Sequence, residues 1–420
     1  MMDVKNMIDK YCSNGVVFKT LGEMGVFENI GVDKKIIKEQ SEIRLLNYMD
    51  VYKHIYIDST TPKMVVTASE SKIKNCTVEK GDIFITPTSE TRDDIGHASV
   101  VLETIPNTCY SYHIMRYRLN ERDMTTSFFI RYLFESSFVR DQIHKYSKGL
   151  TRFGLSKNDF AKITIPFPHI VVRREIVNIL DKFTELEAEL EAELEARRKQ
   201  YEYYRNKLLT FNEITPPLKS EVKWLTMSEV FEIKNGYTPS KAKLEYWTNG
   251  TIPWFRMEDI RTNGRILEDS IRHITSEAVK GGRLFPANSI ILATTATIGE
   301  HALIMIDSLA NQRFTNLSIR KSLINELDMK FFFYYMFIVD EWCKNNTNTS
   351  GFESVDMVKF KKLQIPIPPM EEQQRIVAIL DKFETLVNDI SEGLPAEITA
   401  RRQQYEYYRD KLLTFTKATS

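Results

Sequence analysis

The stretch YEYYRNKLLTF occupies residues 201–211, and YEYYRDKLLTF occupies residues 405–415. Ten of the eleven positions are identical, and only Asn206 and Asp410 differ. Two chance occurrences of so close a match can be discounted in a chain of this length. The chain is therefore an internal duplication, and its function should follow from what the two copies share and where they differ.

The duplication extends to the N-terminal side of both stretches. EIVNILDKF (175–183) corresponds to RIVAILDKF (375–383), and NDFAKITIPFP (158–168) is similar to MVKFKKLQIPIP (357–368). The second copy has four extra residues between its DKF and its Arg-Arg pair. We therefore expect four parts: a first variable domain at 1–168, a first repeated helix at 169–212, a second variable domain at 213–369 and a second repeated helix at 370–420.

Both repeated parts predict long helices. Apolar or aromatic residues recur three or four positions apart from Ile176 to Leu208, and the second copy repeats this stripe. Gly393-Leu394-Pro395 predicts a kink or break there, since proline cannot donate to the preceding turn. Each stripe could pack on its own domain or on the equivalent stripe. The Ala and Glu of LEAELEAELEA (186–196) leave no second apolar face, which favours an antiparallel, coiled-coil-like pair.

The two variable regions predict globular domains of the α/β (α+β) class. GDIFITPTSE (81–90) and NSIILATTAT (288–297) each enter as a strand and leave as a polar loop. FFIRYLFESSFVRDQI (128–143) and FFFYYMFIVDEW (331–342) each predict a buried helix. The expected architecture is thus two copies of one domain, separated by long helices.

Composition limits the classes of function. Lys plus Arg and Asp plus Glu both number 57 in 420 residues, so there is no global basic field. A DNA-binding chain would then need local positive charge or a charged partner. The N-terminal stretch is charged and no apolar run is long enough for a membrane span. Four scattered cysteines without a CxxC pair favour a reducing cytoplasm, and the seven histidines show no metal-ligand spacing.

This ordered duplication resembles the specificity (S) subunit of type I restriction-modification systems. The repeated ILDKF…RRxQYEYYRxKLLTF blocks are similar to the conserved regions of that family. IPWFRMEDIRTNGRI (252–266), SIILATTATIGEHALI (289–304) and NQRFTNLSI (311–319) are similar to one target-recognition domain, and GDIFITPTSETRDDIGHASVV (81–101) to the other. The resemblance covers essentially the whole chain.

The resemblance implies a non-catalytic reader of double-stranded DNA. Two target-recognition domains would each read a few base pairs in the major groove, so the target would be bipartite with an unspecified gap. The family's S subunit binds two methyltransferase (M) subunits, which methylate adenine with S-adenosylmethionine. Two restriction (R) subunits, which use ATP and Mg, complete the complex. No cofactor would be bound by this chain itself.

The repeat LEAE, LEAE, LEAR at 186–197 bears on the gap. In the family that the chain resembles, such repeats tune the gap between the half-sites. One four-residue unit is roughly 6 Å of helix, comparable to one or two base-pair steps. We therefore expect deletion of Leu190–Glu193 to shorten the gap and leave both half-sites unchanged.

Candidate DNA contacts follow from residue type and loop position. Arg and Asn or Gln are the most informative readers of base edges, and short hydroxyls and glycine suit phosphate contacts. Arg256 follows the strand-like IPWF, and RMEDI (256–260) aligns with NYMDV (47–51). The candidates are Arg256, Thr294, Thr295, Thr297, Gly299, Asn311, Gln312 and Arg313 in the second domain, and Asn47, Thr86, Thr88, Ser89, Glu90, Thr91 and Arg152 in the first. Loop Thr, Ser and Asn side chains could instead cap turns, and Trp247 and Trp254 are interpreted as core.

The repeated helices offer the same surface twice, which suits two copies of one partner. The candidate partner-binding residues are Tyr201, Tyr203, Tyr204, Arg205, Tyr405, Tyr407, Tyr408 and Arg409. Half of the tyrosines fall on the apolar stripe, so packing within the chain is an equal alternative.

Catalytic motifs are not found in the sequence. A methyltransferase of this class would need a cofactor glycine loop and an NPPY-like tetrapeptide, and a motor would need GxxxxGK[ST]. We therefore expect no enzymatic activity. The competing interpretation is a bivalent coiled-coil adaptor without DNA contact, which the helices alone do not exclude; a degenerate fused methyltransferase is disfavoured, because no 250-residue cofactor domain fits.

Overall fold

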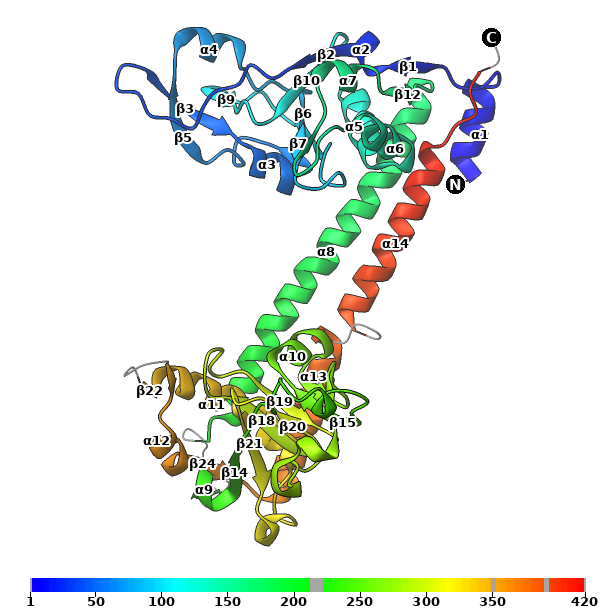
Figure 1. The fold of residues 1–420 in the computed structure, drawn as a ribbon. Helices are drawn as coiled ribbons and strands as arrows, with labels where there is room; N and C mark the ends of the chain where they lie inside the picture. The colour runs from blue at the N-terminus through cyan, green and yellow to red at the C-terminus, as the bar shows by residue number, and fades with distance from the viewer. Residues whose placement is uncertain (1, 212–221, 349–352, 389–392, 419–420) are drawn as a thin grey trace. The chain divides into compact units, whose positions relative to one another are not determined.

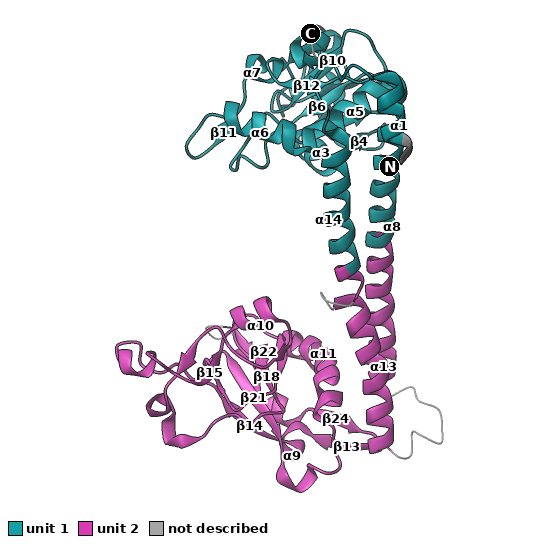
Figure 2. Ribbon diagram, turned by 90° about the vertical axis from the view of Figure 1, so that its right-hand side faces the viewer, with its two compact units in different colours: residues 1–191, 397–420 teal, residues 192–396 magenta. Residues whose placement is uncertain are grey.

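The computed structural model describes residues 2–211, 222–348, 353–388 and 393–418. The chain divides into two compact units, which we call the first unit (Met1–Glu191 with Glu397–Ser420) and the second unit (Ala192–Ala396; Figure 2). Each unit contains one globular domain and parts of the repeated helices. The expected boundary between residues 212 and 213 lies outside the described residues.

The domain of the first unit is built on two sheets. A five-stranded sheet has the order β2-β10-β6-β8-β4, and a three-stranded sheet has the order β5-β3-β9. The elements are α1 (Met2–Tyr11), β1 (Phe18–Thr20), α2 (Leu21–Met24), β2 (Gly25–Glu28), β3 (Ser41–Leu46), α3 (Tyr48–Lys53), β4 (Tyr56–Ile57), β5 (Met64–Ala68), α4 (Glu70–Asn75), β6 (Ile83–Ile85), β7 (Thr88–Ser89), β8 (Ala98–Val101), β9 (Thr108–Tyr110), β10 (Met115–Leu119), α5 (Met124–Glu135), α6 (Ser137–Tyr146), β11 (Phe153–Gly154), α7 (Lys157–Ala161) and β12 (Thr164–Pro166).

The domain of the second unit repeats this topology. Its five-stranded sheet has the order β14-β21-β18-β19-β16, and its three-stranded sheet has the order β17-β15-β20. The elements are β13 (Lys223–Thr226), α9 (Met227–Val230), β14 (Phe231–Asn235), η2 (Leu244–Tyr246), β15 (Ile252–Phe255), α10 (Met257–Asn263), β16 (Ile266–Leu267), β17 (His273–Ile274), η3 (Ser276–Ala278), η4 (Lys280–Gly282), β18 (Ser289–Ala293), β19 (His301–Ile304), β20 (Leu309–Ala310), β21 (Phe314–Ile319), η5 (Lys321–Leu323), α11 (Met329–Asn345), β22 (Thr347–Asn348), β23 (Ser354–Val355), α12 (Met357–Lys362) and β24 (Gln364–Ile367).

Matching strands pair in the same sense in both domains. β3 pairs with β9 in parallel, as β15 does with β20, and β4 with β8 as β16 does with β19. The central strands are buried on both faces: all three residues of β6 and all five of β18 are buried. The prediction that the two domains share one fold is confirmed, because strand order and pairing sense agree throughout both sheets.

Of the two buried helices predicted within the domains, only the one in the first domain differs from the prediction. One helix was expected over 128–143, but the structure has α5 and α6, which meet at Ser136. Ser136 is extended (φ −67°, ψ 147°), and its hydroxyl accepts from the backbone N–H of Val139 at 3.4 Å, which starts a new helix. The single helix prediction was therefore wrong. In the second domain, α11 is one continuous helix, as expected.

The first repeated helix is continuous, and the second copy is divided in two. α8 (Ile170–Leu209) has 40 residues and is about 60 Å long. The second copy consists of α13 (Met370–Asn388) and α14 (Leu394–Leu413), with residues 389–392 outside the described part. Pro395 lies in the first turn of α14, where its missing N–H removes no intrahelical bond. The predicted interruption is confirmed.

The helices pair antiparallel within each unit. In the first unit α14 lies beside the N-terminal half of α8 (Figure 1), where the ring of Phe183 contacts Tyr405 and Tyr408 at centroid distances of 6.4 and 5.7 Å. In the second unit Phe383 of α13 contacts Tyr201 and Tyr204 of α8 at 6.3 and 5.8 Å. The duplicated DKF and YEYY blocks therefore form the same aromatic contact twice.

The helices are also anchored to their own domains through a repeated aspartate. Asp181 accepts hydrogen bonds from Tyr56 (2.6 Å) and from Tyr132. Asp381 accepts from Tyr334 (2.6 Å) and from the ammonium of Lys330 (2.8 Å). Burial raises the pKa of Tyr132 and of Tyr334, and burial with the bond to Asp181 raises the pKa of Tyr56 to about 12. All three hydroxyls thus stay protonated donors at neutral pH.

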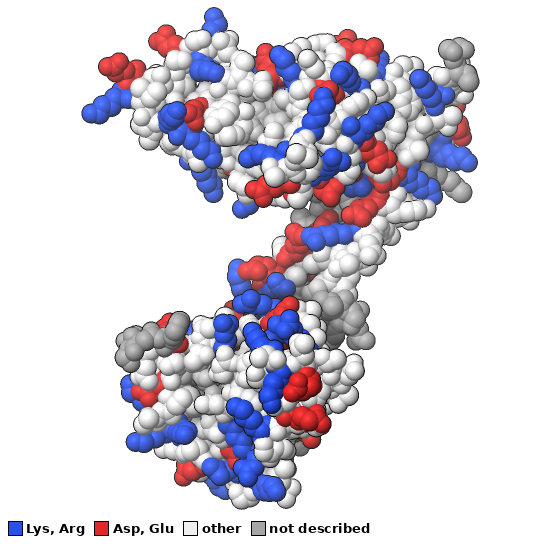
Figure 3. Space-filling model, viewed as in Figure 1, with Lys and Arg blue, Asp and Glu red and all other residues white. Residues whose placement is uncertain are grey.

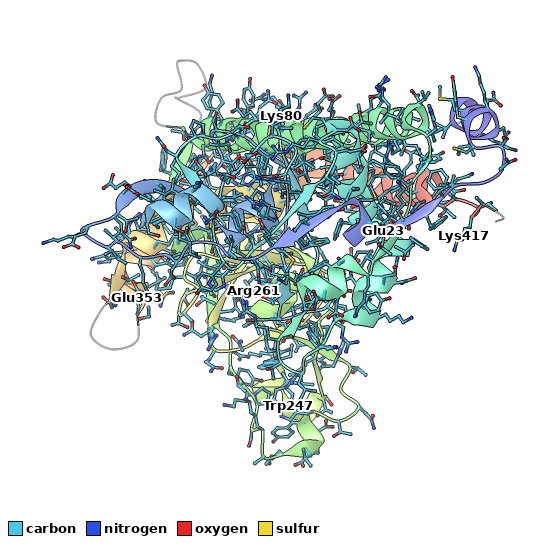
Figure 4. All side chains as sticks on the ribbon, turned by 90° about the horizontal axis from the view of Figure 1, so that it is seen from above. Glu23, Lys80, Trp247, Arg261, Glu353 and Lys417 are labelled. Carbon is cyan, nitrogen blue, oxygen red and sulfur yellow. The ribbon has the colours of Figure 1, made fainter. Side chains whose placement is uncertain are left out.

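The segment around Val16 pairs with residues 416–418 in the first unit. The backbone N–H of Val16 donates to Thr416 (2.9 Å), and that of Ala418 donates back to Val16 (3.0 Å). Gly15 has a φ of +90°, and a side chain there would meet the backbone of Ala418 at 2.7 Å, so this close approach requires glycine. Lys417 is labelled at this end in Figure 4. None of the described helices is long and apolar enough to cross a lipid bilayer.

Candidate nucleic-acid interface

In the second domain, the loops that follow neighbouring strands come together. Asn311, after β20, donates its backbone N–H to Phe255 at the end of β15 (3.0 Å), so Arg256 lies next to it. The backbone N–H of Thr294, after β18, donates to Arg313 (2.9 Å). Hydrogen bonds between strand ends thus gather the candidates that the sequence places in three separate loops.

The tip of this cluster is the turn Asn311–Arg313. The backbone N–H of Arg313 donates to the Asn311 side chain at 2.9 Å, so Asn311 holds the turn, as the capping alternative predicted. Gln312 and Arg313 are exposed. Gln312 accepts a hydrogen bond from the hydroxyl of Thr238 in the loop after β14. Arg313 makes no side-chain hydrogen bond or ion pair within the described residues, which leaves its guanidinium available to a ligand.

The threonine loop after β18 has an unusual backbone. Ala296 has a φ of +67°, which is rare for a residue with a Cβ and marks local strain. Thr294 is buried and shares a 3.0 Å hydrogen bond with Thr315, so it holds the loop from inside. Thr297 is half-buried, and its hydroxyl has no hydrogen-bond partner among the described residues. Thr295 is half-buried and pairs with Ser354.

Gly299 and Arg256 have structural roles in addition to any contact with a ligand. Gly299 is buried with a φ of +84°, and a Cβ there would meet the carbonyl oxygen of Asp340 at 2.7 Å. Glycine at 299 therefore allows the loop to pack on α11. Arg256 is the N-cap residue of α10, and its guanidinium pairs with Glu258 at 2.6 Å. Its Nε is buried without a partner among the described residues.

The first-domain candidates divide into buried and exposed residues. Asn47 is buried and caps α3, because its side chain accepts from the N–H of Met49 (2.9 Å). Thr86 is buried and its hydroxyl accepts from the N–H of His97 (3.0 Å). The remaining first-domain candidates, Thr88, Ser89, Glu90, Thr91 and Arg152, are half-buried or exposed.

These half-buried and exposed residues lie on one loop surface. The guanidinium of Arg152 donates to the hydroxyl of Thr88 at 3.3 Å, and β11 pairs with β7 there. Thr91 donates to Asp94 at 2.6 Å, and this bond lowers the pKa of the Asp94 carboxyl. The structure therefore brings Arg152 to the loop of residues 88–91, although 64 residues separate Arg152 from Thr88 in sequence.

Three exposed or turn-forming residues of the first domain were not among the candidates. Ser111, Tyr112 and His113 follow β9 as Asn311, Gln312 and Arg313 follow β20. The sequences SYH and NQR share no residue, so no local signal identifies this correspondence. It becomes visible only from the parallel pairing of β3 with β9 and of β15 with β20.

Charge is mixed over the surface. Figure 3 shows Lys and Arg interspersed with Asp and Glu on the visible face of each unit, in agreement with the equal numbers of both kinds. The indoles of Trp254 and Trp247 pack edge to face at 4.9 Å, and their N–H groups donate to the backbone carbonyls of Tyr237 and Ser240. Both indoles therefore serve the packing of the second domain. Within the described residues, no three His, Cys, Asp or Glu side chains are placed to hold a metal ion.

The tyrosines of the repeated helices separate into two kinds. Tyr201 is 5 % exposed, and Tyr405 packs against the core of the first unit and donates to Glu135 at 2.6 Å. Tyr203 and Tyr407 are each 60 % exposed. The first pair therefore packs within the chain, and the second pair presents the same side chain to solvent in both copies.

The surroundings of the exposed pair are also alike. Tyr203 contacts Tyr204 at 5.3 Å and lies under the ammonium of Lys207 at 5.7 Å. Tyr407 contacts Tyr408 at 5.2 Å and lies under Lys411 at 5.4 Å. The two arginines also share one contact, because Arg205 lies over Tyr201 at 5.4 Å and Arg409 over Tyr405 at 5.5 Å. Arg205 lies in addition 4.2 Å from the ring of Phe337. The Tyr–Lys pair is thus a repeated feature of this surface whose ring is equally exposed in both copies.

A family model, the type I restriction modification DNA specificity domain, matches the chain twice, at residues 14–196 and 219–400. The Escherichia coli type I restriction enzyme EcoprrI specificity subunit is 55 % identical over 202 residues, which are 46 % of this chain and 50 % of that protein. The E. coli EcoR124I/EcoR124II specificity subunit is 43 % identical over 271 residues, 61 % of this chain and 64 % of that protein. The matches thus span between half and two thirds of these relatives.

A third relative and one solved structure extend the comparison. A putative specificity subunit of Haemophilus influenzae, S.HindORF215P, is 33 % identical over 309 residues, 71 % of this chain and 73 % of that protein. A chain solved in work on complex assembly of the type I R-M system has a TM-score of 0.65 at 17 % identity, over 95 % of this chain and 97 % of that chain. The latter likeness concerns the fold. With two matched domains in the order that the duplication predicts, the chain belongs to the family of type I restriction-modification specificity subunits.

Proposed function

We propose that this chain is the DNA-recognition subunit of a type I restriction-modification complex and is itself non-catalytic. It reads a bipartite target, one half-site with each domain, across an unspecified gap. The observation that carries this proposal is the repetition of one scaffold with different polar loops at the same strand ends. In such an arrangement, two domains of one fold can recognise two different DNA sequences.

The exposed members of each loop cluster have the chemistry of base and phosphate contacts. Gln312 and Arg313 in the second domain can pair with adenine and guanine edges in the major groove. In the first domain, the exposed guanidinium of Arg152 and the half-buried hydroxyl of Thr88 can donate to phosphate or to base edges. The exposed hydroxyl of Thr91 donates to Asp94, so it can accept from a base. The neutral net charge agrees with a complex in which partner subunits supply much of the phosphate contact.

The exposed Tyr203–Lys207 and Tyr407–Lys411 pairs are the proposed docking sites for two methyltransferase subunits. Amphipathic rings that are exposed and alike in both copies suit two identical partners. Around Tyr407 the surface forms a concavity of about 650 Å³ that is lined by Gln403, Glu406, Asp410, Lys411 and Thr414. The methyltransferase subunits would carry S-adenosylmethionine, and restriction subunits attached through them would use ATP and Mg. The complex would act in the cytoplasm.

The test is reconstitution with its methyltransferase partner and a library of duplexes of random sequence. After methylation, sequencing of the modified adenines should reveal two short specified blocks separated by a constant number of unspecified base pairs. One block, or none, would refute the bipartite reading. Failure to bind any duplex in the presence of the methyltransferase would instead favour the bivalent adaptor.

The docking proposal is tested with single and double variants. Tyr203→Ala and Tyr407→Ala should each reduce the bound methyltransferase from two copies to one, and the double variant should bind none, as measured by native mass spectrometry. Tyr11→Ala, which removes a ring that is 40 % exposed on α1, is the matched control and should leave two copies bound. Two bound copies in the double variant would place docking elsewhere.

A further inference from the structure

The turn after β9 and the turn after β20 have the same internal hydrogen bonds. In the second domain the N–H of Arg313 donates to the side chain of Asn311 (2.9 Å), and the N–H of Phe314 donates to its carbonyl (3.1 Å). In the first domain the N–H of His113 donates to the hydroxyl of Ser111 (3.3 Å), and that of Ile114 to its carbonyl (3.1 Å). Two different polar side chains therefore hold one turn geometry.

The two turns are also attached to their domains in the same way. The N–H of Ser111 donates to Leu46 at the end of β3 (2.8 Å), and that of Asn311 to Phe255 at the end of β15 (3.0 Å). A glycine packs against each turn: Gly31 from the loop after β2, and Gly236 from the loop after β14. A Cβ on Gly31 would meet the N–H nitrogen of Tyr112 at 2.2 Å, and one on Gly236 would meet the carbonyl of Asn311 at 2.2 Å.

The side chains at the middle and last positions of the turns are exposed and differ in chemistry. Tyr112, which is 46 % exposed, lies against the ring of His113 at a centroid distance of 4.0 Å. Gln312 and Arg313 stand at the corresponding positions. Positions needed only for folding would be buried, as Ile114 and Phe314 are directly after each turn. A fixed backbone with exposed, divergent side chains is the arrangement expected of a reading position.

We propose that residues 112–113 and 312–313 are the corresponding specificity-determining pairs of the two domains, which we call the tip pairs. This inference rests on the proposed function. Arg313 would pair with a guanine edge and Gln312 with an adenine edge, as their geometry permits. Tyr112 and His113 would contact a different base. The tyrosine hydroxyl or an imidazole nitrogen would form a hydrogen bond with a base edge, or the tyrosine ring would pack against a thymine methyl group. The tip pairs thus give one scaffold two different half-sites.

The experiment exchanges the tip pairs in the complete methyltransferase complex. Tyr112→Gln with His113→Arg should change the preferred base or reduce discrimination roughly 10- to 100-fold at one or two positions of one half-site. The other half-site and the gap should stay as in the wild type. Gln312→Tyr with Arg313→His should have the corresponding effect on the other half-site only. Both are measured as kcat/KM on duplexes that vary one base pair at a time.

The controls distinguish a loss of folding, a failure of the tip-pair proposal and a failure of the proposed function. Tyr11→Ala removes another exposed ring of the first unit that is stacked on a histidine, His169 at 5.0 Å, and should leave the motif unchanged. Amide hydrogen exchange in β3, β9, β15 and β20 shows whether a variant keeps its fold. If a variant with an exchanged tip pair is unfolded, the base preference of Tyr112→Ala and Gln312→Ala is measured instead. Unchanged discrimination in folded variants of both domains would overturn the tip pairs. A wild-type complex without sequence preference would overturn the proposed function itself.

Discussion

The first and second domains differ in their polar interiors although their sheets agree strand by strand. In the second domain, His301 and Asp340 form a buried pair at 2.7 Å, and both side chains are at most 6 % exposed. In the first domain, Ala98 occupies the corresponding first position of β8. There, a buried Arg131 pairs instead with Glu135, which also accepts from Tyr405. The scaffold therefore accommodates different polar groups in its interior: a fully buried His–Asp pair in the second domain and, in the first, a buried arginine whose Glu135 partner is 36 % exposed.

The repeated helices show the opposite behaviour. The contacts of Phe183 with Tyr408 and of Phe383 with Tyr204 differ by 0.1 Å in centroid distance (5.7 and 5.8 Å). The domains vary where loops and interiors allow it, and the helices keep the same contacts. The comparison indicates that the helices supply the contacts that both halves of the chain share, whereas the loops supply the side chains by which the two domains differ.

The largest expected effect is a domain-specific loss of stability in Asp340→Ala. Removing one partner of this buried hydrogen bond should cost about 3 kcal/mol, because the imidazole of His301 is left without its Asp340 partner. Amide exchange should accelerate in β19 and α11, while β8 and α5 stay as in the wild type. Equal acceleration of amide exchange in both domains would contradict the expectation that the loss of stability is confined to the second domain.

The second prediction concerns the connection between the domains. Deleting Leu190–Glu193 removes about one helical turn, or ~6 Å, from α8. Methylation at the original spacing should fall by more than about 100-fold, and a motif with the same half-sites and a shorter gap should replace it. Methylome mapping in a host that carries the variant measures this. Replacing the same four residues by alanine keeps the length and should keep the gap; an unchanged gap in the deletion variant would refute the prediction.

The third prediction tests the equivalence of the two anchors. Asp181→Ala and Asp381→Ala each remove the acceptor of two hydrogen bonds to the adjacent domain. Each should lower the free energy of unfolding of its own unit by about 1–3 kcal/mol. Limited proteolysis, which cuts the opened unit, should show losses of similar size. A loss in only one unit would show that the repeated aspartates have separated in role.

The smallest expected effect concerns the exposed ion pairs of Arg402 with Glu187 and Glu191 in the first unit. The Arg402 side chain is 55 % exposed, so Arg402→Ala should cost less than ~1 kcal/mol. The cost should decrease further at high salt. Thermal unfolding at two salt concentrations measures it; a loss above 2 kcal/mol would mean that these pairs hold α14 on α8.

The sequence by itself determined the duplication, the repeated helices with their interruption, and the shared domain fold. These properties are readable because they depend on local periodicity, on proline and on direct identity of residues. The YEYY blocks and the ILDKF blocks could be matched by eye, and each match has its counterpart in the aromatic contacts and aspartate anchors. The interruption was visible because Pro395 cannot donate within a helix.

Only the tertiary structure decided which candidates face solvent and which positions correspond. Asn47 and Thr86 are buried and hold turns, which their residue types alone left open. Tyr203 and Tyr407 were separated from Tyr201 and Tyr405 by packing. The correspondence of Ser111–His113 with Asn311–Arg313 depends on parallel pairing between strands more than 50 residues apart. Register of that kind is fixed by non-local backbone hydrogen bonds, which are largely indifferent to the side chains that the turn presents.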